Sequence, residues 1–330
     1  MNTLRAVGAP AVSVIVPARN SAATLARTLA ALAASDFGGE VELVVVDDCS
    51  DDATGEIARS AGARVVRLTE QHGPAGARNA GIAATSAPLI AFTDADCTPS
   101  PGWLRATVRA LADADLVTGP VLPDPGVPVG RFDRTLSLTE ASPRFETANL
   151  AVRRTTAEAI GGFEPFAPVP GRDDLGLRPR PDQGHFGEDA VFGWRARRHG
   201  ARIAFAPDAL VHHAVFPRGA RGYVAERWRL RFFPALVREL PELRATLPGR
   251  VFLSERSRRF DAAVAGVALA AGRRRAWPLA LALPYVRRDL RTWQPLTRSG
   301  VRENAALVLG DVVGAAALVR GSVAARRWLL

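Results

Sequence analysis

The stretch PLIAFTDADCTPS, residues 88–100, joins an apolar run to two aspartates. Leu89–Phe92 has the composition of a short buried strand, and Asp94 and Asp96 follow it with only Ala95 between them. If the strand continued through Ala95, side-chain alternation would put both carboxylates on the same side. Because like charges repel, we expect a divalent cation or a diphosphate to sit between them. The alternative is an ordinary polar turn, where aspartate is common.

Apolar, β-branched runs alternate with segments of helical periodicity over the first hundred residues. The expected strands are 12–16, 41–46, 64–68 and 88–92, and the expected helices are 21–35, 54–62 and 73–85. Such alternation predicts an α/β fold with a parallel sheet, whose ligands bind at the carboxyl ends of the strands. Residues 17–20, 47–50 and 94–96 fall at those ends, so we expect them to converge on one edge.

Composition limits the class of protein. The chain has 330 residues, of which 48% are hydrophobic and 23% charged, so it is globular rather than disordered. The net charge of +10 comes from arginine, since the sequence contains no lysine, and the excess lies after residue 194. A nucleic acid or an anionic membrane would suit that part. Cys49 and Cys97 fit no zinc or disulfide pattern, and the N-terminus lacks the apolar segment of a signal peptide.

Four blocks of the sequence resemble those of one enzyme family. VSVIVPARN, VVVDDCSDD, GPAGARNAG and AFTDADC are similar, in order and spacing, to the N-terminal blocks of the family 2 glycosyltransferases, and further matches continue to about residue 213. Ser21 departs from the pattern, since many members carry Glu there. The resemblance implies a GT-A fold, a Rossmann-like, mixed and mostly parallel sheet flanked by helices. It places the catalytic domain at residues 1–220 and a helical, basic C-terminal extension at 221–330.

The resemblance also assigns roles at the predicted sheet edge. Asp94 would hold the ribose or a metal-bound water, and Asp96 would bind Mg²⁺ or Mn²⁺ bridging the diphosphate. Asp48 would accept a hydrogen bond from the base or ribose. The nucleotide-sugar side as a whole comprises Pro17, Ala18, Arg19, Asn20, Asp47, Asp48, Arg78, Asp94, Ala95 and, from a later block, Asn149. Two alternatives stay open: Asp47 and Asp48 as a helix N-cap pair with Ser50, and Arg78 as a solvated arginine on a helix.

Two further blocks supply the acceptor side by the same resemblance. Asn149, in FETANLAVRR, would lie near the donor sugar, and Asp189, in GEDAVFGWRARRHG, would be the general base beside Glu188. Alternatively, Glu188 and Asp189 simply favour the positive end of the helix expected to begin near Glu188. The Pro- and Gly-rich segment 167–187 is predicted to be a mobile loop that orders over the donor.

His213 completes the residues that the resemblance implies. The pattern that starts at Pro207, in RIAFAPDALVHHAV, ends at His213, which could approach the metal or the diphosphate. A structural histidine in the second of two short strands is the alternative. Together with Asp94 and Asp96, His213 makes up the predicted metal site.

The C-terminal part combines apolar segments with arginines. Residues 223–240 predict an amphipathic helix, and three apolar stretches follow at 262–272, 276–286 and 305–319, the last containing Asp311. Each is shorter than the roughly 20 residues that span a bilayer. Arginines flank all three, so we expect interfacial helices on an anionic membrane. A packed helical domain is the alternative; a nucleic-acid surface is disfavoured because no recognition motif accompanies the charge.

These observations predict a glycosyltransferase that moves a sugar from a nucleotide-diphosphate donor to a hydroxyl of a glycan or lipid-linked acceptor. By resemblance it would be inverting and metal-dependent, and it would act in cell-envelope glycan or glycolipid synthesis, peripherally on the cytoplasmic side of the membrane. The alternatives are a non-catalytic sugar-nucleotide-binding or membrane scaffold protein and a nucleotidyltransferase. The latter would need a lysine-containing phosphate loop, and the chain has no lysine.

Overall fold

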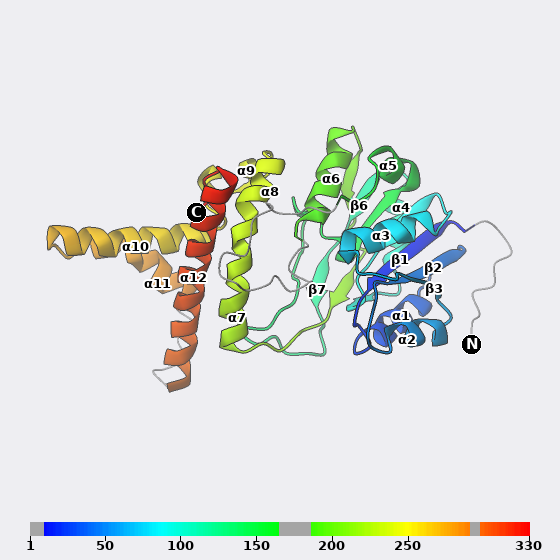
Figure 1. Ribbon diagram of the computed structural model, residues 1–330, viewed down its shortest axis with the longest axis horizontal. Coiled ribbons are helices and arrows are strands. Elements are labelled where there is room, and N and C mark those ends of the chain that lie inside the picture. Colours follow the sequence, from blue (N-terminus) through cyan, green and yellow to red (C-terminus); the bar gives the residue numbers. More distant parts are fainter. Residues whose placement is uncertain (1–9, 165–185, 291–297) are drawn as a thin grey trace. The chain divides into compact units, whose positions relative to one another are not determined.

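The computed structural model describes residues 10–164, 186–290 and 298–330. The chain divides into two compact units (Figure 1). Unit 1 holds the described residues up to Phe216 except Arg131–Asp133, which belong to unit 2 together with the chain from Pro217 onward. Each unit is described by itself.

Unit 1 is built on a seven-stranded sheet with the order β3-β2-β1-β4-β8-β6-β9. All neighbouring strands run parallel except β8, which is antiparallel to both β4 and β6. The N-terminal strands have continuous apolar runs because both faces of this part of the sheet are covered. The strand bounds are β1 Val12–Ala18, β2 Val41–Asp47, β3 Arg64–Arg67, β4 Leu89–Phe92, β6 Leu116–Thr118, β8 Leu150–Arg153 and β9 Ile203–Phe205.

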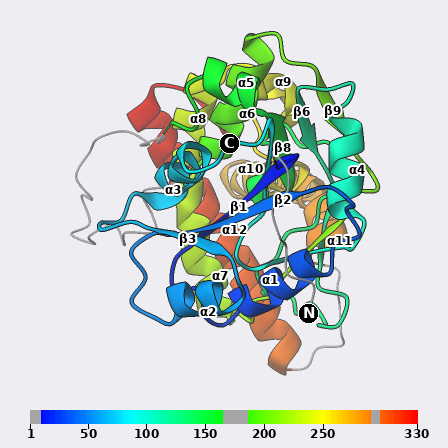
Figure 2. The same ribbon diagram turned by 90° about the vertical axis from the view of Figure 1, so that its right-hand side faces the viewer.

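Helices cover both faces of this sheet. Figures 1 and 2 show α3 on one face of β1 and β2, with α1 and α2 on the other. Gly81 allows α3 to approach closely, because a Cβ built there would lie 2.4 Å from Cγ2 of Ile15. The helices of unit 1 are α1 Leu25–Ala33, α2 Thr54–Ser60, α3 Gly73–Ala83, α4 Trp103–Ala110, α5 Arg154–Ala159 and α6 Glu188–Arg198. The predicted α/β fold with a mostly parallel, helix-flanked sheet is therefore confirmed.

A second, three-stranded sheet joins distant parts of unit 1. It has the order β5-β10-β7, with β5 at Cys97–Pro99, β7 at Val121–Pro123 and β10 at Val211–His213. Strand β10 is antiparallel to β5, in a register that pairs His213 with Cys97. This pairing carries His213 to the aspartates that follow β4. Because β4 ends at Phe92, the condition under which Asp94 and Asp96 would point to the same side of one strand is not met.

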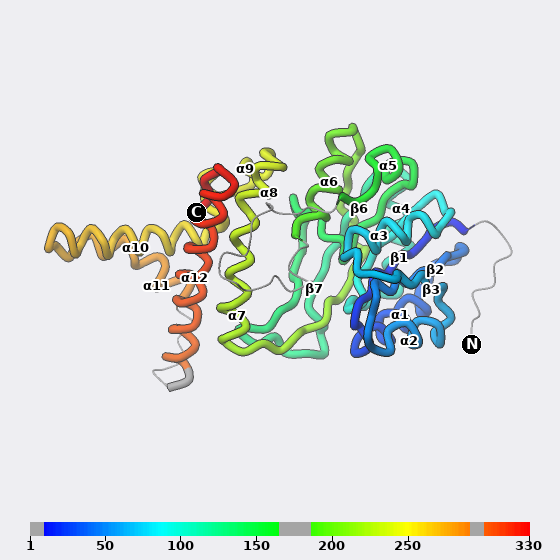
Figure 3. The backbone as a smooth tube through the Cα atoms, in the orientation of Figure 1, coloured from blue at the N-terminus to red at the C-terminus, as the bar shows by residue number. Residues whose placement is uncertain are grey.

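Unit 2 is helical. Its elements are α7 Ala220–Arg227, η3 Trp228–Phe232, α8 Phe233–Glu239, α9 Leu243–Thr246, η4 Pro248–Arg250, α10 Glu255–Arg273, η5 Trp277–Ala282, α11 Leu283–Asp289 and α12 Arg298–Ala325. The backbone trace in Figure 3 shows α7 and α8 running beside α12. The helix predicted over 223–240 is present as three consecutive helical pieces, α7, η3 and α8, rather than as one continuous α-helix. Pro234 has no N–H to donate to a preceding turn and instead lies in the first turn of α8.

The third apolar stretch belongs to a longer helix than the sequence suggested. Gly300–Ala325, within α12, is long and apolar enough to cross a membrane, which corrects the expectation of a sub-spanning segment. Half of its most apolar window is nevertheless buried against the rest of the structure. Long apolar helices also form the cores of soluble proteins, and the burial of this part of α12 is of that kind.

Asp311 anchors α12 within unit 2. Its side chain is buried and accepts hydrogen bonds from Arg256 at 2.8 to 3.1 Å and from the Tyr285 hydroxyl at 2.5 Å. Arg227 lies 3.5 Å from its other carboxylate oxygen. These partners come from α7, α10 and α11. An aspartate in an apolar helix is costly unless it is paired, so this cluster explains how α12 accommodates it.

Candidate active site

The loops after β1 and β2 are joined by hydrogen bonds. Asn20 has φ of 48°, a left-handed conformation that asparagine tolerates better than most residues. Its backbone N–H donates to Ser50 Oγ at 3.0 Å, and its side-chain oxygen accepts from the backbone N–H of Asp51 at 2.8 Å. The role of Asn20 in the described residues is thus to hold two strand-end loops together at the carboxyl edge of the sheet.

Asp47 and Asp48 are both buried and both bonded to protein. Asp47 accepts from the backbone N–H of Ser50 at 3.0 Å and pairs with Arg67. Asp48 accepts from the backbone N–H groups of His72 and Gly73, at 2.7 and 2.8 Å. Asp48 therefore holds the start of α3 against the end of β2, and any contact of its carboxylate with a base or ribose would use its remaining lone pairs.

Arg78 is the centre of the carboxylate cluster. It lies on α3, is only 4% exposed, and so is not the solvated arginine of the alternative interpretation. Its guanidinium lies 3.1 Å from Asp94 and 3.3 Å from both Glu188 and Asp189. Burial alone would lower the pKa of Arg78, but the three carboxylates outweigh burial and raise it. The positively charged side chain of Arg78 thus joins the end of β4 to the start of α6.

Asp189 combines a fixed position with access from solvent. One carboxylate oxygen faces Arg78, and the other accepts from the backbone N–H of Thr147 at 3.1 Å. Burial raises the pKa of Asp189 to about 7, with Arg78 opposing the rise and Glu188 adding to it. The side chain remains 24% exposed, so a substrate group can reach it. A carboxylate with a pKa near neutrality suits a general base.

The residue just before helix α6 has a backbone conformation that glycine adopts most easily. Gly187, the N-cap of α6, has φ of 78°, in the left-handed region. Glu188 and Asp189 follow at once, in the first turn, where the helix dipole favours negative charge. The alternative role of these two residues at the helix terminus is therefore realised, and it does not compete with a catalytic role because both carboxylates also contact Arg78.

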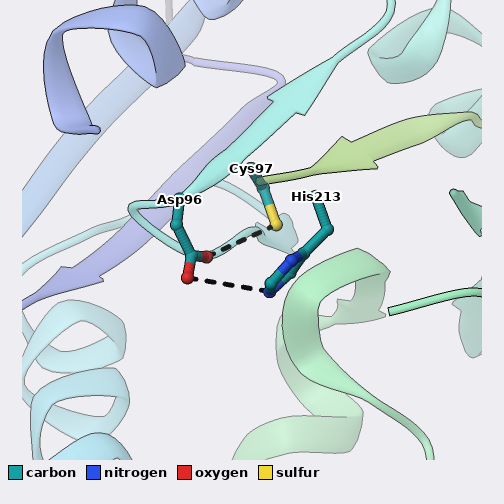
Figure 4. A group of neighbouring side chains, drawn as sticks. All are labelled: Asp96, Cys97 and His213. Atoms are coloured by element: carbon teal, nitrogen blue, oxygen red, sulfur yellow. Dashed lines mark hydrogen bonds and ion pairs between the residues drawn. The ribbon is translucent and has the colours of Figure 1, made fainter. Parts of the chain in front are cut away.

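Asp96 and His213 face each other, with Cys97 beside them (Figure 4). The Nε2 atom of His213 lies 3.6 Å from a carboxylate oxygen of Asp96, and Cys97 Sγ lies 3.8 Å from the other. Burial, with the charge of Asp94 added, raises the pKa of Asp96. The ligand atoms of these three side chains are close enough together to bind one metal ion. The Asp94 carboxylate is paired with Arg78 instead.

The donor set of this cluster fits a divalent cation of the Mg²⁺ or Mn²⁺ type. The Nδ1 atom of His213 lies 2.6 Å from the carbonyl oxygen of Ala214, which can only accept, so Nδ1 carries the proton and the Nε2 lone pair faces Asp96. Burial raises the pKa of the Cys97 thiol, and sulfur is a soft ligand that Mg²⁺ and Mn²⁺ do not prefer. Carboxylate oxygen and imidazole nitrogen therefore remain as the ligands.

Asn149 is held entirely by protein groups. It is buried, its amide nitrogen donates to the carbonyls of Pro120 and Ala209 at 2.9 and 2.6 Å, and its oxygen accepts from Trp103 Nε1 at 2.8 Å. These bonds tie η1, at Thr147–Asn149, to two loops and to α4. The side chain thus braces the segment that carries Thr147, the partner of Asp189.

The remaining predicted residues lie near the ends of β1 and β4. Pro17 lies in the part of β1 that no longer pairs with β4. The N–H that proline lacks is therefore not needed for a hydrogen bond to β4. Ala18 is buried, and Ala95 is buried with its carbonyl accepting from Thr28. Arg19 has a buried Nε without a hydrogen-bond partner among the described residues. The segment 167–187, predicted to close over the donor, lies outside the described residues except for its last two positions.

Sequence patterns missed several residues of this site. Cys97 joins the cluster only through the β5–β10 pairing, and Thr147 contributes a backbone N–H, which no side-chain pattern reveals. Phe163 lies under the Arg78 guanidinium, 5.5 Å from ring centroid to Cζ. It also stacks on Phe192 of α6 at 4.0 Å.

A Rossmann-like mixed sheet with carboxylates gathered at its carboxyl edge is the architecture of a GT-A glycosyltransferase. The profile of the family described as Glycosyl transferase family 2 matches residues 13–166. Glycosyltransferase AglE of Haloferax volcanii is 31% identical in an alignment of 226 positions that covers 64% of this chain and 69% of that protein. The chain belongs to glycosyl transferase family 2, and the predicted family and class of enzyme are confirmed.

Other relatives show how far the likeness extends. Succinoglycan biosynthesis protein ExoU of Rhizobium meliloti is 32% identical in an alignment of 225 positions that covers 64% of this chain and 62% of that protein. Pre-mycofactocin glycosyltransferase of Mycobacterium tuberculosis is 28% identical over 221 residues, 61% of this chain and 42% of that protein. The chain thus spans less than two thirds of these two relatives. Mannosyltransferase PcManGT from Pyrobaculum calidifontis has the same fold, with a TM-score of 0.63, 23% identity, and coverage of 94% of this chain and 88% of that one.

Proposed function

We propose that unit 1 transfers a sugar from a nucleoside diphosphate sugar to a hydroxyl acceptor, with inversion. The observation that carries the proposal is the position of Asp189. It is fixed by Arg78 and Thr147, its pKa is raised to about 7, and it stays open to solvent. A scaffold that had lost catalysis would have no need to keep a base in this state. Family membership supports the reaction class.

The donor would lie along the carboxyl edge of the large sheet. We assign its nucleotide to the ends of β1 and β2, where Arg19 has a buried Nε without a partner in the part of the chain that the structure describes. An unsatisfied guanidinium group favours an anionic or acceptor-rich ligand. PcManGT was solved with GDP-Man and Mn²⁺, which agrees with a nucleoside diphosphate sugar and a divalent cation without naming either for this chain.

Asp96 and His213 would hold the divalent cation. When bound, such a cation neutralises the negative charge that grows on the departing nucleoside diphosphate. The Asp94 carboxylate pairs with Arg78, whereas the Asp96 carboxylate faces His213. We therefore assign Asp94 to the ribose or to a metal-bound water and Asp96 to the cation.

The residues around Asp189 account for the proton transfer. An acceptor hydroxyl hydrogen-bonded to Asp189 would give its proton to the carboxylate as its oxygen bonds to the anomeric carbon. The bond from that carbon to the diphosphate breaks on the opposite face, which inverts the configuration. Arg78 and the Thr147 N–H keep the carboxylate oriented, and Arg78 lowers the pKa of Asp189 enough to leave a usable fraction ionised near neutrality.

Unit 2 supports a place for the enzyme at a membrane. It exposes large apolar side chains, including Trp277, Val301 and Trp328, and it carries many arginines. We propose that the protein is peripheral on the cytoplasmic face of an anionic membrane. The acceptor would be a glycan or lipid-linked, in cell-envelope glycan or glycolipid synthesis.

A donor panel tests the reaction class. Purified protein is incubated with UDP-, GDP- and dTDP-sugars, with and without Mn²⁺ or Mg²⁺, and release of nucleoside diphosphate is measured. We expect hydrolysis of one donor class that needs the cation and disappears on chelation. Release from no donor under any cation would contradict the proposal.

A further inference from the structure

Unit 2 contains an open cleft of about 690 Å³ whose lining includes none of the candidate active-site residues. Helices α10 and α11 and the 3₁₀ segment η5 form its walls. Its apolar lining includes Ala262, Leu281, Leu283 and Pro284. The volume is within the roughly 300–1,000 Å³ of small-molecule sites. The cleft therefore offers a built, mostly apolar surface to a ligand with a hydrocarbon part.

Close packing shapes the cleft. Gly266 on α10 lets η5 approach, because a Cβ built at Gly266 would lie 2.6 Å from the carbonyl oxygen of Pro278 and 2.9 Å from Cβ of Leu281. Phe260 and Tyr285 are both buried, and their rings pack edge to face at 5.5 Å between α10 and α11. Two elements locked in this way present a preformed site rather than one that a ligand must create.

Four arginines also line the cleft, and two of them are already paired. Arg258 lies 2.6 Å from Glu255, and Arg259 makes two hydrogen bonds to Asp289, at 2.7 and 2.8 Å. Arg287 and Arg288 are exposed and have no ion-pair or hydrogen-bond partner among the described residues. Two acids against four arginines leave a net charge of about +2 at the cleft, located at Arg287 and Arg288.

The surface around the cleft is apolar as well. Trp277, Leu279 and Val286 are 62%, 47% and 39% exposed on η5 and α11. Leu281 and Leu283 also expose more than two fifths of their surface, at 43% and 46%. Apolar side chains gathered in this way indicate a non-aqueous partner. A tryptophan following an arginine run, here Arg273–Arg275, is typical of the membrane interface.

We propose that this cleft binds an anionic membrane phospholipid. The phosphate lies on the unpaired guanidinium groups of Arg287 and Arg288, which match a phosphate in charge and geometry. The acyl chain lies along Leu281, Leu283 and Pro284. The site deepens the membrane association proposed above by naming where a lipid is held, and it stands whether or not unit 1 transfers sugar.

Charge reversal at the cleft tests the phosphate contact. Full-length protein is titrated with phosphatidylcholine vesicles that contain or lack phosphatidylglycerol. We expect binding only with phosphatidylglycerol, and we expect the variant R287E/R288E to lose about tenfold or more in affinity. The matched control is R326E/R327E, which makes the same charge change at an exposed vicinal arginine pair elsewhere in unit 2. That control should retain most of the binding.

A filling substitution tests the apolar part without changing charge. Ala262→Trp occupies the cleft, whereas Ala265→Trp adds the same side chain at an exposed position of α10 outside it. Only Ala262→Trp should weaken vesicle binding. If the double charge variant fails to fold, this pair carries the test. Nucleotide-donor turnover in detergent is measured for every variant and should be unchanged, which separates failure of the cleft from failure of unit 1.

Several outcomes would overturn the proposal. Equal losses in the cleft and control variants would mean diffuse electrostatic adsorption, and equal binding to vesicles without phosphatidylglycerol would remove the anionic requirement. Binding of inorganic phosphate or glycerol phosphate together with failure to bind vesicles would identify a free-phosphate site instead. Full-length protein that binds no vesicle of either kind would refute both the cleft and the membrane association.

Discussion

Arg78 shows how a single residue determines the electrostatics of the site. Its guanidinium contacts Asp94 from one element and Glu188 and Asp189 from another, and it opposes the burial that raises the pKa of Asp189. The sequence placed Arg78 on a helix beside the nucleotide, but it held no sign of these partners. They lie 16, 110 and 111 positions away in the chain. Non-local ion pairs of this kind depend on strand and helix placement.

Arg78→Lys tests this positioning role. Lysine keeps the charge but cannot bond three carboxylates in one plane, so the pKa of Asp189 should rise above about 7. We expect kcat/KM at pH 7 to fall by about tenfold and to recover at higher pH. The pH dependence of kcat/KM is the measurement. An equal loss at all pH values, with an unmoved midpoint, would mean that Arg78 does not tune Asp189.

Substitutions at Asp96 and at its neighbour Cys97 should affect stabilisation by the cation differently. We expect Mn²⁺ to raise the Tm of the wild type and of Cys97→Ala, because Mn²⁺ prefers oxygen and imidazole ligands to a thiol. Asp96→Asn should abolish this Mn²⁺ effect while leaving the metal-free protein folded, since it relieves repulsion with Asp94. Thermal unfolding with and without Mn²⁺ measures both. A normal Mn²⁺ shift in Asp96→Asn would exclude the proposed metal role.

Elements near in sequence were predictable, whereas their long-range partners were not. The N-terminal strands and helices were predicted correctly because buried parallel strands give unbroken apolar runs and the helices keep a 3.6-residue period. The antiparallel insertion of β8 between β4 and β6 leaves no local mark. Nor does the pairing of β10 with β5, which brings His213 to Asp96 and Cys97. Pro234 was visible in the sequence, and its effect on the helix over 223–240 was underestimated.

The backbone conformation at the start of α6 should matter for the position of the catalytic carboxylates. Gly187→Ala forces a side chain into the left-handed region at the N-cap, which costs about 1–2 kcal/mol and displaces Glu188 and Asp189. The matched control is Gly200→Ala, just past the end of α6, which has φ of 89° and no atom within 4 Å of a built Cβ. Both variants should lose a few degrees of Tm, but only Gly187→Ala should lose kcat. Equal kcat values would show that the start of α6 does not position the base.

The molecule as a whole joins an α/β unit to a helical unit with a different surface. Unit 2 pairs its buried acid, Asp311, within its own helices, yet it leaves apolar side chains and arginines exposed. Composition predicted this combination of charge and apolar surface. It could not predict that the third apolar stretch is part of the long helix α12, because the flanking polar residues hid the helix bounds.

Salt and detergent distinguish the two forces that act on unit 2. Attraction between arginine and anionic lipid is screened by salt, whereas insertion of apolar side chains is not. We expect the full-length protein to cofractionate with membranes, to be partly released by high salt and to be released fully only by detergent. Fractionation followed by immunoblotting measures this. A protein that remains wholly in the supernatant at low salt would contradict the membrane association.

Asp189 as the general base is the central claim, and its pH profile tests that claim most directly. Below pH 7, kcat/KM for sugar transfer by the wild type should fall about tenfold per pH unit as Asp189 becomes protonated, and above pH 7 it should level off. Asp189→Asn keeps the shape but cannot accept a proton. It should bind donor normally, transfer about 100- to 10,000-fold more slowly and lose the acidic limb. Transfer by Asp189→Asn at a near-normal rate, with the acidic limb intact, would show that the base lies elsewhere.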